Sequence, residues 1–70
     1  LDAGEFEIDK ILDHDGDPSR KLEMQFLVKW KGFDESHNSW EPWKHLYNTS
    51  QLHLYLRQKK MARLIPQHLK

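Results

Sequence analysis

The sequence predicts an α+β fold in which a three-stranded antiparallel meander is followed by one helix. In the first half of the chain, apolar and polar residues alternate with a period of two, the pattern of half-buried strands. In the second half, apolar residues at helical spacing follow a cluster of capping residues. With 70 residues and no cysteine, we expect residues 1–70 to form one small domain without disulfides or thiolate metal sites.

Three short strands account for the first half of the chain. The alternation begins near Phe6, and the adjacent pair Ile11 and Leu12 interrupts it, which predicts a bulge in the first strand. A run rich in Asp, Gly and Pro then forms a turn before the second strand. Pro42 cannot donate to a sheet ladder and ends the third strand. We expect the strands over residues 6–14, 22–30 and 39–41.

One long helix is expected in the second half. Asn48 is the best N-cap candidate, because Gln51 follows three residues later in a capping-box-like pair. Pro66 ends the helix near Leu64. The face that packs on the sheet turns basic after two turns, so we expect the helix to overrun the sheet edge. This packing face consists of Leu52, Tyr55 and Leu56.

A second apolar stripe, formed by Leu54, Met61 and Ile65, is expected on the opposite side of this helix. An apolar face directed away from the core needs cover. The stripe is therefore a candidate contact with other domains of a larger protein.

The net charge of zero hides a division of the chain into two halves. Residues 1–41 hold all 11 acidic residues and carry a net charge of −6, whereas residues 42–70 carry +6. Exposed cations without nearby acids can contact DNA or RNA, although basic residues at a helix end also suit the helix dipole. The candidate nucleic-acid contacts are Arg57, Lys59, Lys60 and Arg63.

Catalytic and metal-binding patterns are missing from the sequence. No two histidines have metal-ligand spacing on a helix face, and no nucleophile elbow is present. Asp13, Asp15 and Asp17 resemble the start of a calcium loop, but Pro18 and Met24 occupy positions where that loop needs Gly and Glu. We therefore expect neither an enzyme nor a cofactor. No apolar run approaches membrane-spanning length.

Six of the eight aromatic residues fall into two groups by position. Mid-strand and helix-face positions predict that Phe26, Trp40 and Tyr55 belong to the core. The remaining candidates of interest stand at the ends of elements, where large rings are often half exposed at a sheet rim. These candidate binding residues are Phe6, Trp30 and Phe33.

Three segments resemble the chromodomain: residues 5–12 (EFEIDKIL), 26–33 (FLVKWKGF) and 38–42 (NSWEP). The resemblance covers about residues 5–58 and leaves 59–70 as a basic helix end and tail. It implies a curved three-stranded antiparallel sheet, a partial SH3-like barrel, with a C-terminal α-helix packed across one end. It also implies a nuclear, chromatin-associated module that binds a methylated lysine in a histone H3 tail.

The same resemblance assigns roles to individual residues. Phe6, Trp30 and Phe33 correspond to an aromatic cage around the methylammonium, so we expect Trp30→Ala to abolish binding while the domain stays folded. The histone peptide would lie as an extended strand between residues 3–7 and 43–47. The corresponding groove residues are Glu5, Glu7, Glu41, His45 and Tyr47.

Three positions depart from heterochromatin-protein chromodomains. His37 stands where these relatives carry an acid beside the methylammonium, His45 where they carry an Asn, and Tyr47 where they carry an acid. Residues 43–46 (WKHL) and 64–66 (LIP) instead resemble chromodomains at the C-terminal end of integrases of gypsy-class LTR retrotransposons. That resemblance implies a module that directs an integrase to chromatin.

Three hypotheses therefore remain open from the sequence. The first is a methyl-lysine reader, and the second is a nucleic-acid-binding module that uses the basic helix. The third is a protein–protein adaptor with a degenerate cage, which would use the stripe of Leu54, Met61 and Ile65.

Overall fold

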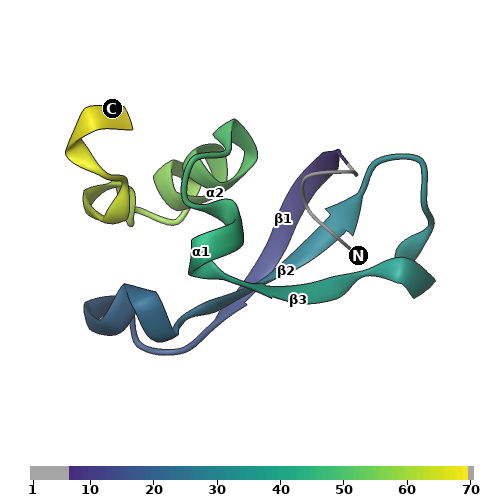
Figure 1. The fold of residues 1–70 in the computed structure, drawn as a ribbon, viewed down its shortest axis with the longest axis horizontal. Coiled ribbons are helices and arrows are strands. Elements are labelled where there is room, and N and C mark those ends of the chain that lie inside the picture. Colours follow the sequence, from purple (N-terminus) through teal and green to yellow (C-terminus); the bar gives the residue numbers. More distant parts are fainter. Residues whose placement is uncertain (1–6, 70) are drawn as a thin grey trace.

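An open, twisted three-stranded sheet forms the centre of the molecule (Figure 1). The computed structural model describes residues 7–69. The strands are β1 (Ile8–Asp15), β2 (Gln25–Trp30) and β3 (Ser39–Pro42), in the order β1-β2-β3 with both pairs antiparallel. Two helices follow, α1 (Trp43–Leu46) and α2 (Ser50–Gln58). The predicted α+β class, with three antiparallel strands followed by a helix, is confirmed.

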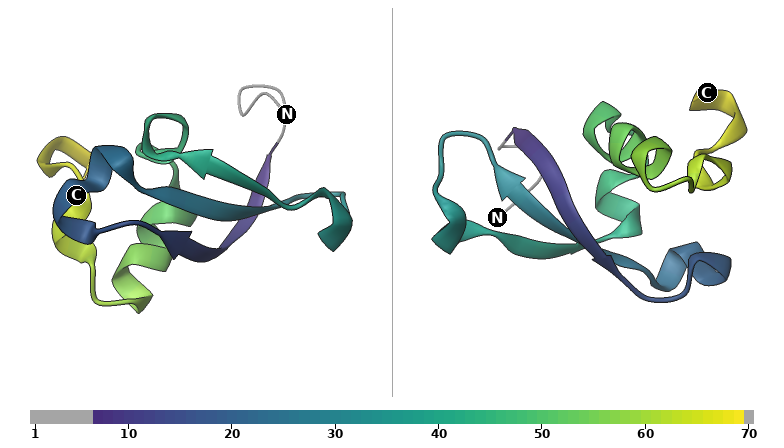
Figure 2. Two further views of the ribbon diagram at one scale, coloured as in Figure 1. Left: turned by 90° about the horizontal axis from the view of Figure 1, so that it is seen from below. Right: turned by 180° about the vertical axis from the view of Figure 1, so that it is seen from behind.

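The helices gather near one end of the sheet, away from the loop that joins β2 to β3 (Figure 1). Helix α2 packs against β1, and α1 follows β3 directly (Figure 2). Short 3₁₀ turns complete the fold, at Pro18–Glu23, Glu35–His37, Ala62–Leu64 and Gln67–Leu69.

The predicted bulge in β1 is present. The pairing register with β2 shifts between Ile8 and Lys10 and again between Ile11 and Asp13. These shifts let both Ile8 and Ile11 face the core although they are three residues apart in a strand.

Strand β2 begins three residues later than expected. Residues Pro18–Glu23 form 3₁₀ turns, because Asp17 accepts a hydrogen bond from the backbone N–H of Ser19 and Pro18 supplies a preset φ. Leu22, expected in the strand, is instead 78% exposed. Gly16 is required beside this turn, since it has a φ of 104° and a Cβ there would lie 3.2 Å from Met24 Cα.

The core is built on one face of β2. Phe26, Val28 and Trp30 of β2 are fully buried, as is Met24 directly before the strand, and they pack with apolar residues from the rest of the fold. The other members of this cluster are Ile8, Ile11, Trp43, Leu46, Leu52, Tyr55, Leu56, Met61, Leu64 and Ile65.

The expectation that Trp40 belongs to the core is wrong. Glu41 pairs with Phe26 across the sheet, so Glu41 faces the core side and the neighbouring Trp40, paired with Leu27, faces away. As a result Trp40 is 45% exposed, whereas the Glu41 side chain is buried.

Helix α2 begins one residue later than expected, because Thr49 and not Asn48 is the N-cap. The Thr49 hydroxyl accepts a hydrogen bond from the N–H of Leu52 at 3.3 Å and donates one to the carbonyl of Leu46 at 2.8 Å. The second bond ties the start of α2 to the end of α1, a helix that the sequence did not predict.

Helix α2 also ends at Gln58, well before the expected end near Leu64. Lys60 adopts a left-handed φ of 61°, and its N–H bonds to Arg57 O at 3.2 Å while the Met61 N–H bonds to Leu56 O at 2.7 Å. These two bonds form a Schellman motif, which terminates a helix and satisfies its last carbonyls. The helix therefore stops before most of the basic segment that was expected to extend it.

The early helix end removes the predicted apolar stripe. After the turn at Lys60 the chain folds back, so Met61 and Ile65 are buried in the core at 7% and 3% exposure. Leu54 remains on the helix surface and is 57% exposed. The expected outward stripe of Leu54, Met61 and Ile65 is therefore wrong.

Candidate functional site

Trp30 and Phe33 lie on either side of a tight turn at the end of β2. Gly32 takes a φ of 85° in this turn, and the Phe33 N–H bonds to the Trp30 carbonyl at 3.1 Å. The Trp30 ring is fully buried, so the expectation of a half-exposed rim position is wrong for this residue. Phe33 is partly buried and packs against the core cluster. The candidates Phe6 and Glu5 lie outside the described residues.

Lys29 fixes the loop that carries Phe33. Its Nζ donates to the Phe33 carbonyl at 2.6 Å and to the Trp30 carbonyl at 3.4 Å. The same ammonium group forms an ion pair with Asp9 Oδ2 at 3.6 Å, which connects the loop to β1. Sequence reasoning missed this role, because Lys29 looked like an ordinary outward-facing residue between Val28 and Trp30.

A chain of polar contacts runs from Trp30 to His45. Trp30 Nε1 donates to Ser39 Oγ at 2.9 Å, and Ser39 Oγ donates to Glu41 Oε2 at 2.8 Å. Glu41 Oε1 lies 3.3 Å from His45 Nδ1. The structure thus brings together one cage candidate and two groove candidates, and Ser39, which the sequence did not single out, connects them.

One of the two expected groove walls, residues 43–47, is largely helical. Residues 43–46 form helix α1, and the Tyr47 N–H bonds to the Trp43 carbonyl at 3.0 Å. Tyr47 itself is 38% exposed. Glu7 is exposed, and its backbone carbonyl accepts a hydrogen bond of 2.9 Å from the N–H of Lys31 beside the Trp30 turn.

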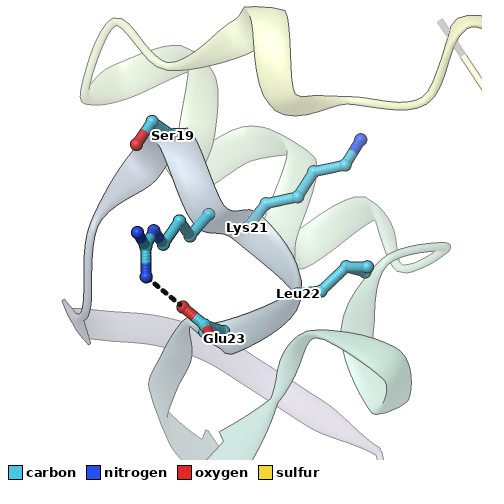
Figure 3. Close-up of a pocket in the computed structure, with 5 residues that line it drawn as sticks. Ser19, Lys21, Leu22 and Glu23 are labelled. Carbon is cyan, nitrogen blue, oxygen red and sulfur yellow. Dashed lines mark ion pairs between the residues drawn. The ribbon is translucent and has the colours of Figure 1, made fainter.

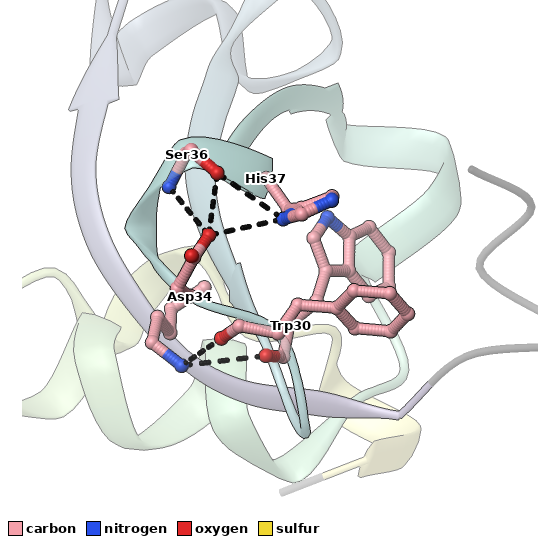
Figure 4. A network of polar contacts seen from close by, with 6 residues as sticks. Trp30, Asp34, Ser36 and His37 are labelled. Atoms are coloured by element: carbon pink, nitrogen blue, oxygen red, sulfur yellow. Dashed lines mark hydrogen bonds and ion pairs between the residues drawn. The ribbon is translucent and has the colours of Figure 1, made fainter.

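His37 contacts the Phe33 ring. The two ring centroids are 5.1 Å apart with the planes tilted by 52°. His37 closes the 3₁₀ turn Glu35–His37, and its Nδ1 lies 3.1 Å from Asp34 Oδ1 (Figure 4). Ser36 donates two hydrogen bonds to the same Asp34 oxygen, one from its backbone N–H and one from its hydroxyl. These bonds, first from Ser36 and then from His37, hold the pKa of Asp34 below its usual value.

The candidate nucleic-acid contacts surround the end of α2. Arg57, Lys59, Lys60 and Arg63 are all exposed. Lys59 Nζ stands 5.7 Å from the centre of the Tyr55 ring. The Schellman turn gathers these side chains in one short segment of the surface.

A surface hollow of about 470 Å³ lies over the 3₁₀ turns before β2 (Figure 3). Its lining residues are Ser19, Arg20, Lys21, Leu22 and Glu23. Arg20 and Glu23 form an exposed ion pair of 3.7 Å in it, and Lys21 Nζ lies 5.2 Å from the centre of the Trp43 ring. This hollow contains none of the residues singled out from the sequence.

Within residues 7–69, no group of three or more His, Asp or Glu side chains is arranged to hold a metal ion. None of the helices in this part of the chain is long and apolar enough to cross a membrane.

Comparison with known proteins identifies what the chain resembles. A profile of the Chromo (CHRromatin Organisation MOdifier) domain matches residues 6–58. A putative DNA (cytosine-5)-methyltransferase CMT1 of Arabidopsis thaliana is 43% identical over 51 residues, which is 69% of this chain and 6% of the relative. Histone-lysine N-methyltransferase SUV39H1-A of Danio rerio is 51% identical over 39 residues, 56% of this chain and 10% of the relative.

A third relative, chromobox protein homolog 2 of Mus musculus, is 56% identical over 23 residues, 33% of this chain and 4% of the relative. In each of the three the match spans a tenth or less of the relative's own length.

Proposed function

Because the chain belongs to the chromodomain family, we propose that it is a chromatin reader that binds a methylated lysine in a histone H3 tail. The observation that best supports this proposal is the placement of Trp30 and Phe33 on one tight turn, which the hydrogen bonds from Lys29 Nζ hold in place. A methylated ammonium keeps its charge but loses hydrogen bonds to water, so aromatic faces compete well for it. Each ring contact contributes about 0.5–2 kcal/mol, with Trp the strongest. Phe6 is the third proposed member of the cage.

The full burial of Trp30 adds a step to this proposal. A ligand can reach the indole only after the groups that cover it move aside. We expect binding to expose the ring and then to cover it again with the methylammonium. Such a rearrangement is common where a segment becomes ordered on a partner.

The peptide backbone is proposed to pair with the sheet at β3. Among the described strands, β3 lies at an edge and pairs only with β2. Addition of an extended peptide to an exposed edge supplies main-chain hydrogen bonds, while side-chain pockets supply specificity. Glu41 lies in β3 and His45 in the helix that follows it, and the net charge of −6 in residues 1–41 favours encounter with a basic tail.

The proposal is tested by calorimetric titration with histone H3 tail peptides that carry either an unmodified or a methylated lysine. We expect the methylated peptide to bind at least about tenfold more tightly, as two or three ring contacts imply. Phe33→Ala should remove this difference. Leu54→Ala, which truncates an exposed apolar side chain on α2, is the control and should keep it. Equal binding of both peptides by the wild-type chain would refute the reader function.

Trp30→Ala is a poor probe despite the importance of the residue. Trp30 is part of the buried core, and truncation of a buried aromatic side chain costs roughly 3–5 kcal/mol. In so small a domain such a loss threatens the fold itself, so the expectation from sequence that this variant stays folded no longer holds.

The resemblance to integrase chromodomains extends the proposal to a cellular role. As part of a longer protein, the module would direct an integrase to chromatin in the nucleus. A fluorescent fusion of this chain should concentrate on chromatin, and the Phe33→Ala fusion should lose that pattern while the Leu54→Ala fusion keeps it. An even distribution of the wild-type fusion would contradict this role.

A second candidate function is contact with the phosphate backbone of DNA or RNA. The specific observation is Lys60, which occupies the left-handed position of a Schellman motif where glycine is favoured. A non-glycine residue in this conformation carries backbone strain, and such strain is more frequent at functional sites. Arg57, Lys59 and Arg63 are exposed beside it, and the sequence contains no acid after Glu41.

Fluorescence anisotropy with duplex DNA and with RNA of the same sequence tests this second function. Binding should weaken steeply with added salt, and Lys59→Gln with Lys60→Gln should weaken it further. The control pair Arg20→Gln with Lys31→Gln removes two exposed cations from the acidic half and should have a smaller effect. Binding that is absent, insensitive to salt or equally reduced by both pairs would exclude this surface.

A further inference from the structure

We propose that His37 sets the methylation-state preference of this site, a proposal that rests on the proposed function. Its neutral imidazole, held at Nδ1 by Asp34, would offer Nε2 as a hydrogen-bond acceptor to the ammonium group of the ligand. The site would then prefer monomethyl- and dimethyl-lysine over trimethyl-lysine.

Position is the first support. The His37 imidazole packs on the Phe33 ring, with 5.1 Å between centroids, so it stands next to a proposed cage wall. In Figure 4 the His37 ring lies between the Asp34 carboxylate and the side chain of Trp30 in this view. The 3₁₀ turn Glu35–His37 fixes this placement, because Asp34 caps the turn and the His37 N–H bonds to the Asp34 carbonyl at 3.1 Å.

The hydrogen bonds of Asp34 determine which ring nitrogen carries the proton. A carboxylate can only accept hydrogen bonds, and Asp34 is ionised near neutral pH. Its Oδ1 lies 3.1 Å from His37 Nδ1, so Nδ1 must be the donor. The contacts of the Ser36 hydroxyl are consistent with this assignment. The hydroxyl donates its hydrogen bond to Asp34, so its oxygen can accept one from Nδ1 at 3.3 Å. In the neutral ring Nε2 then carries a lone pair.

The lone pair on Nε2 can distinguish the methylation states of lysine, because these states differ in the number of N–H donors. Monomethyl- and dimethylammonium groups keep two and one N–H bonds, whereas trimethylammonium keeps none. Hydrogen bonds to a charged partner are among the stronger ones in proteins. A trimethylated ligand would offer Nε2 no donor.

Protonation of His37 should abolish this selection. A proton on Nε2 converts the acceptor into a donor and places a positive charge beside the cationic ligand. Among the described residues, the His37 ring has polar contacts with Asp34 and Ser36 and a ring contact with Phe33, and Asp34 carries the charge in this group. In the protonated form, His37 and Asp34 would be an ion pair with 3.1 Å between Nδ1 and Oδ1.

The test is a set of titrations with monomethyl, dimethyl and trimethyl peptides of one sequence, at about pH 8 and about pH 5.5, on either side of the range in which imidazoles titrate. At the higher pH the wild-type chain should bind the dimethyl peptide roughly tenfold more tightly than the trimethyl peptide, the ratio expected for one good hydrogen bond. At the lower pH this ratio should shrink.

Two variants separate selection from simple packing. His37→Phe keeps a ring on Phe33 but removes the acceptor, so it should still bind methylated peptides while losing both the preference and its pH dependence. His68→Phe, an exposed histidine in the last 3₁₀ turn, is the control and should behave as the wild-type chain. An unchanged ratio in His37→Phe, or a wild-type preference for the trimethyl peptide, would overturn the proposal.

A measurement without ligand gives an independent check. In a ¹⁵N NMR spectrum of the histidine rings near pH 8, His37 should be the tautomer protonated at Nδ1, and an Nε2-protonated ring would overturn the proposal. If the wild-type chain fails to distinguish methylated from unmodified peptide, the reader function and this proposal both fall. If it distinguishes them and His37→Phe changes nothing, only this proposal falls.

Discussion

The indole Nε1 of Trp30 donates a hydrogen bond of 2.9 Å to the hydroxyl of Ser39 on the neighbouring strand. The Ser39 hydroxyl in turn donates a hydrogen bond of 2.8 Å to the Glu41 carboxylate. One small side chain therefore satisfies the polar atom of a fully buried ring and holds a buried carboxylate at the same time. This links the orientation of the proposed cage ring to the charge at the start of the proposed groove.

Ser39→Ala should lower the free energy of unfolding by about 1–3 kcal/mol, because it leaves a buried N–H and a buried carboxylate with fewer partners. Urea denaturation followed by tryptophan fluorescence measures the change. Ser39→Thr keeps the hydroxyl and should recover most of the loss. Ser50→Ala, at an exposed position in the first turn of α2, is the control. Similar losses in Ser39→Ala and Ser50→Ala would contradict the role of the hydroxyl.

Thr49→Ala should destabilise the domain by about 1 kcal/mol, the usual cost of losing an N-cap. Thr49 both caps α2 and bonds to the Leu46 carbonyl of α1. Asn48→Ala is the matched control, since Asn48 is exposed and next to the cap, and it should change stability by less than about 0.5 kcal/mol. Thermal or urea denaturation decides between them. A larger loss for Asn48→Ala would mean that the sequence-based choice of cap was right.

Both predicted ends of α2 were wrong, because the sequence does not contain the signals that fix them. Asn48 and Thr49 are both good caps, and only the contact between Thr49 and α1 distinguishes them. At the other end the usual glycine signal is replaced by Lys60, so Pro66 looked like the terminator of a helix that had already ended.

In the sheet and the site, too, the features that were not predicted depend on contacts between residues far apart in the sequence. The strands followed from periodicity, but the direction in which Trp40 and Glu41 face depends on their register with β2, which no local pattern encodes. The motif around Trp30 and Phe33 identified the candidate rings. Lys29 and Ser39 were missed because their roles depend on contacts with residues that only the fold brings near.

Lys60→Gly should stabilise the domain by about 1 kcal/mol, because a non-glycine residue pays about that much in the left-handed region. Lys59→Gly removes the same charge from the adjacent position. Lys59 has an ordinary φ of −94°, so this control should give no stabilisation. Both variants are compared by urea denaturation. A loss of stability in Lys60→Gly would indicate that the lysine side chain contributes more to the fold than its backbone strain costs.

Ile65→Ala should lower stability by about 2–5 kcal/mol, the cost of truncating a large buried aliphatic side chain. Ile65 is 3% exposed although it lies beyond the last residue of α2. Leu54→Ala, at a position 57% exposed, should change stability by less than about 0.5 kcal/mol. The comparison of these two variants tests whether Ile65 is part of the core or belongs to an exposed apolar stripe with Leu54. A stripe would give small and similar effects at both positions.

Tyr55 should make the domain sensitive to alkaline pH. Burial, and to a lesser extent the negative charge of Asp13, raises the pKa of the Tyr55 phenol above its usual value, and the phenol oxygen lies 2.7 Å from His14 Nδ1. The folded state therefore holds the phenolic proton more tightly than the unfolded chain does. The resulting stabilisation is complete below about pH 10 and is lost as the pH rises through the folded-state pKa.

Urea denaturation at several values between about pH 8 and about pH 11, which brackets the usual tyrosine pKa, measures this effect. The free energy of unfolding should fall more steeply with pH in the wild-type chain than in Tyr55→Phe. Tyr47→Phe, at a more exposed tyrosine, should keep the wild-type slope. Lysine titration in this range is common to all three proteins and cancels in the comparison. Equal slopes in the wild type and in Tyr55→Phe would show that the buried phenol does not control the alkaline transition.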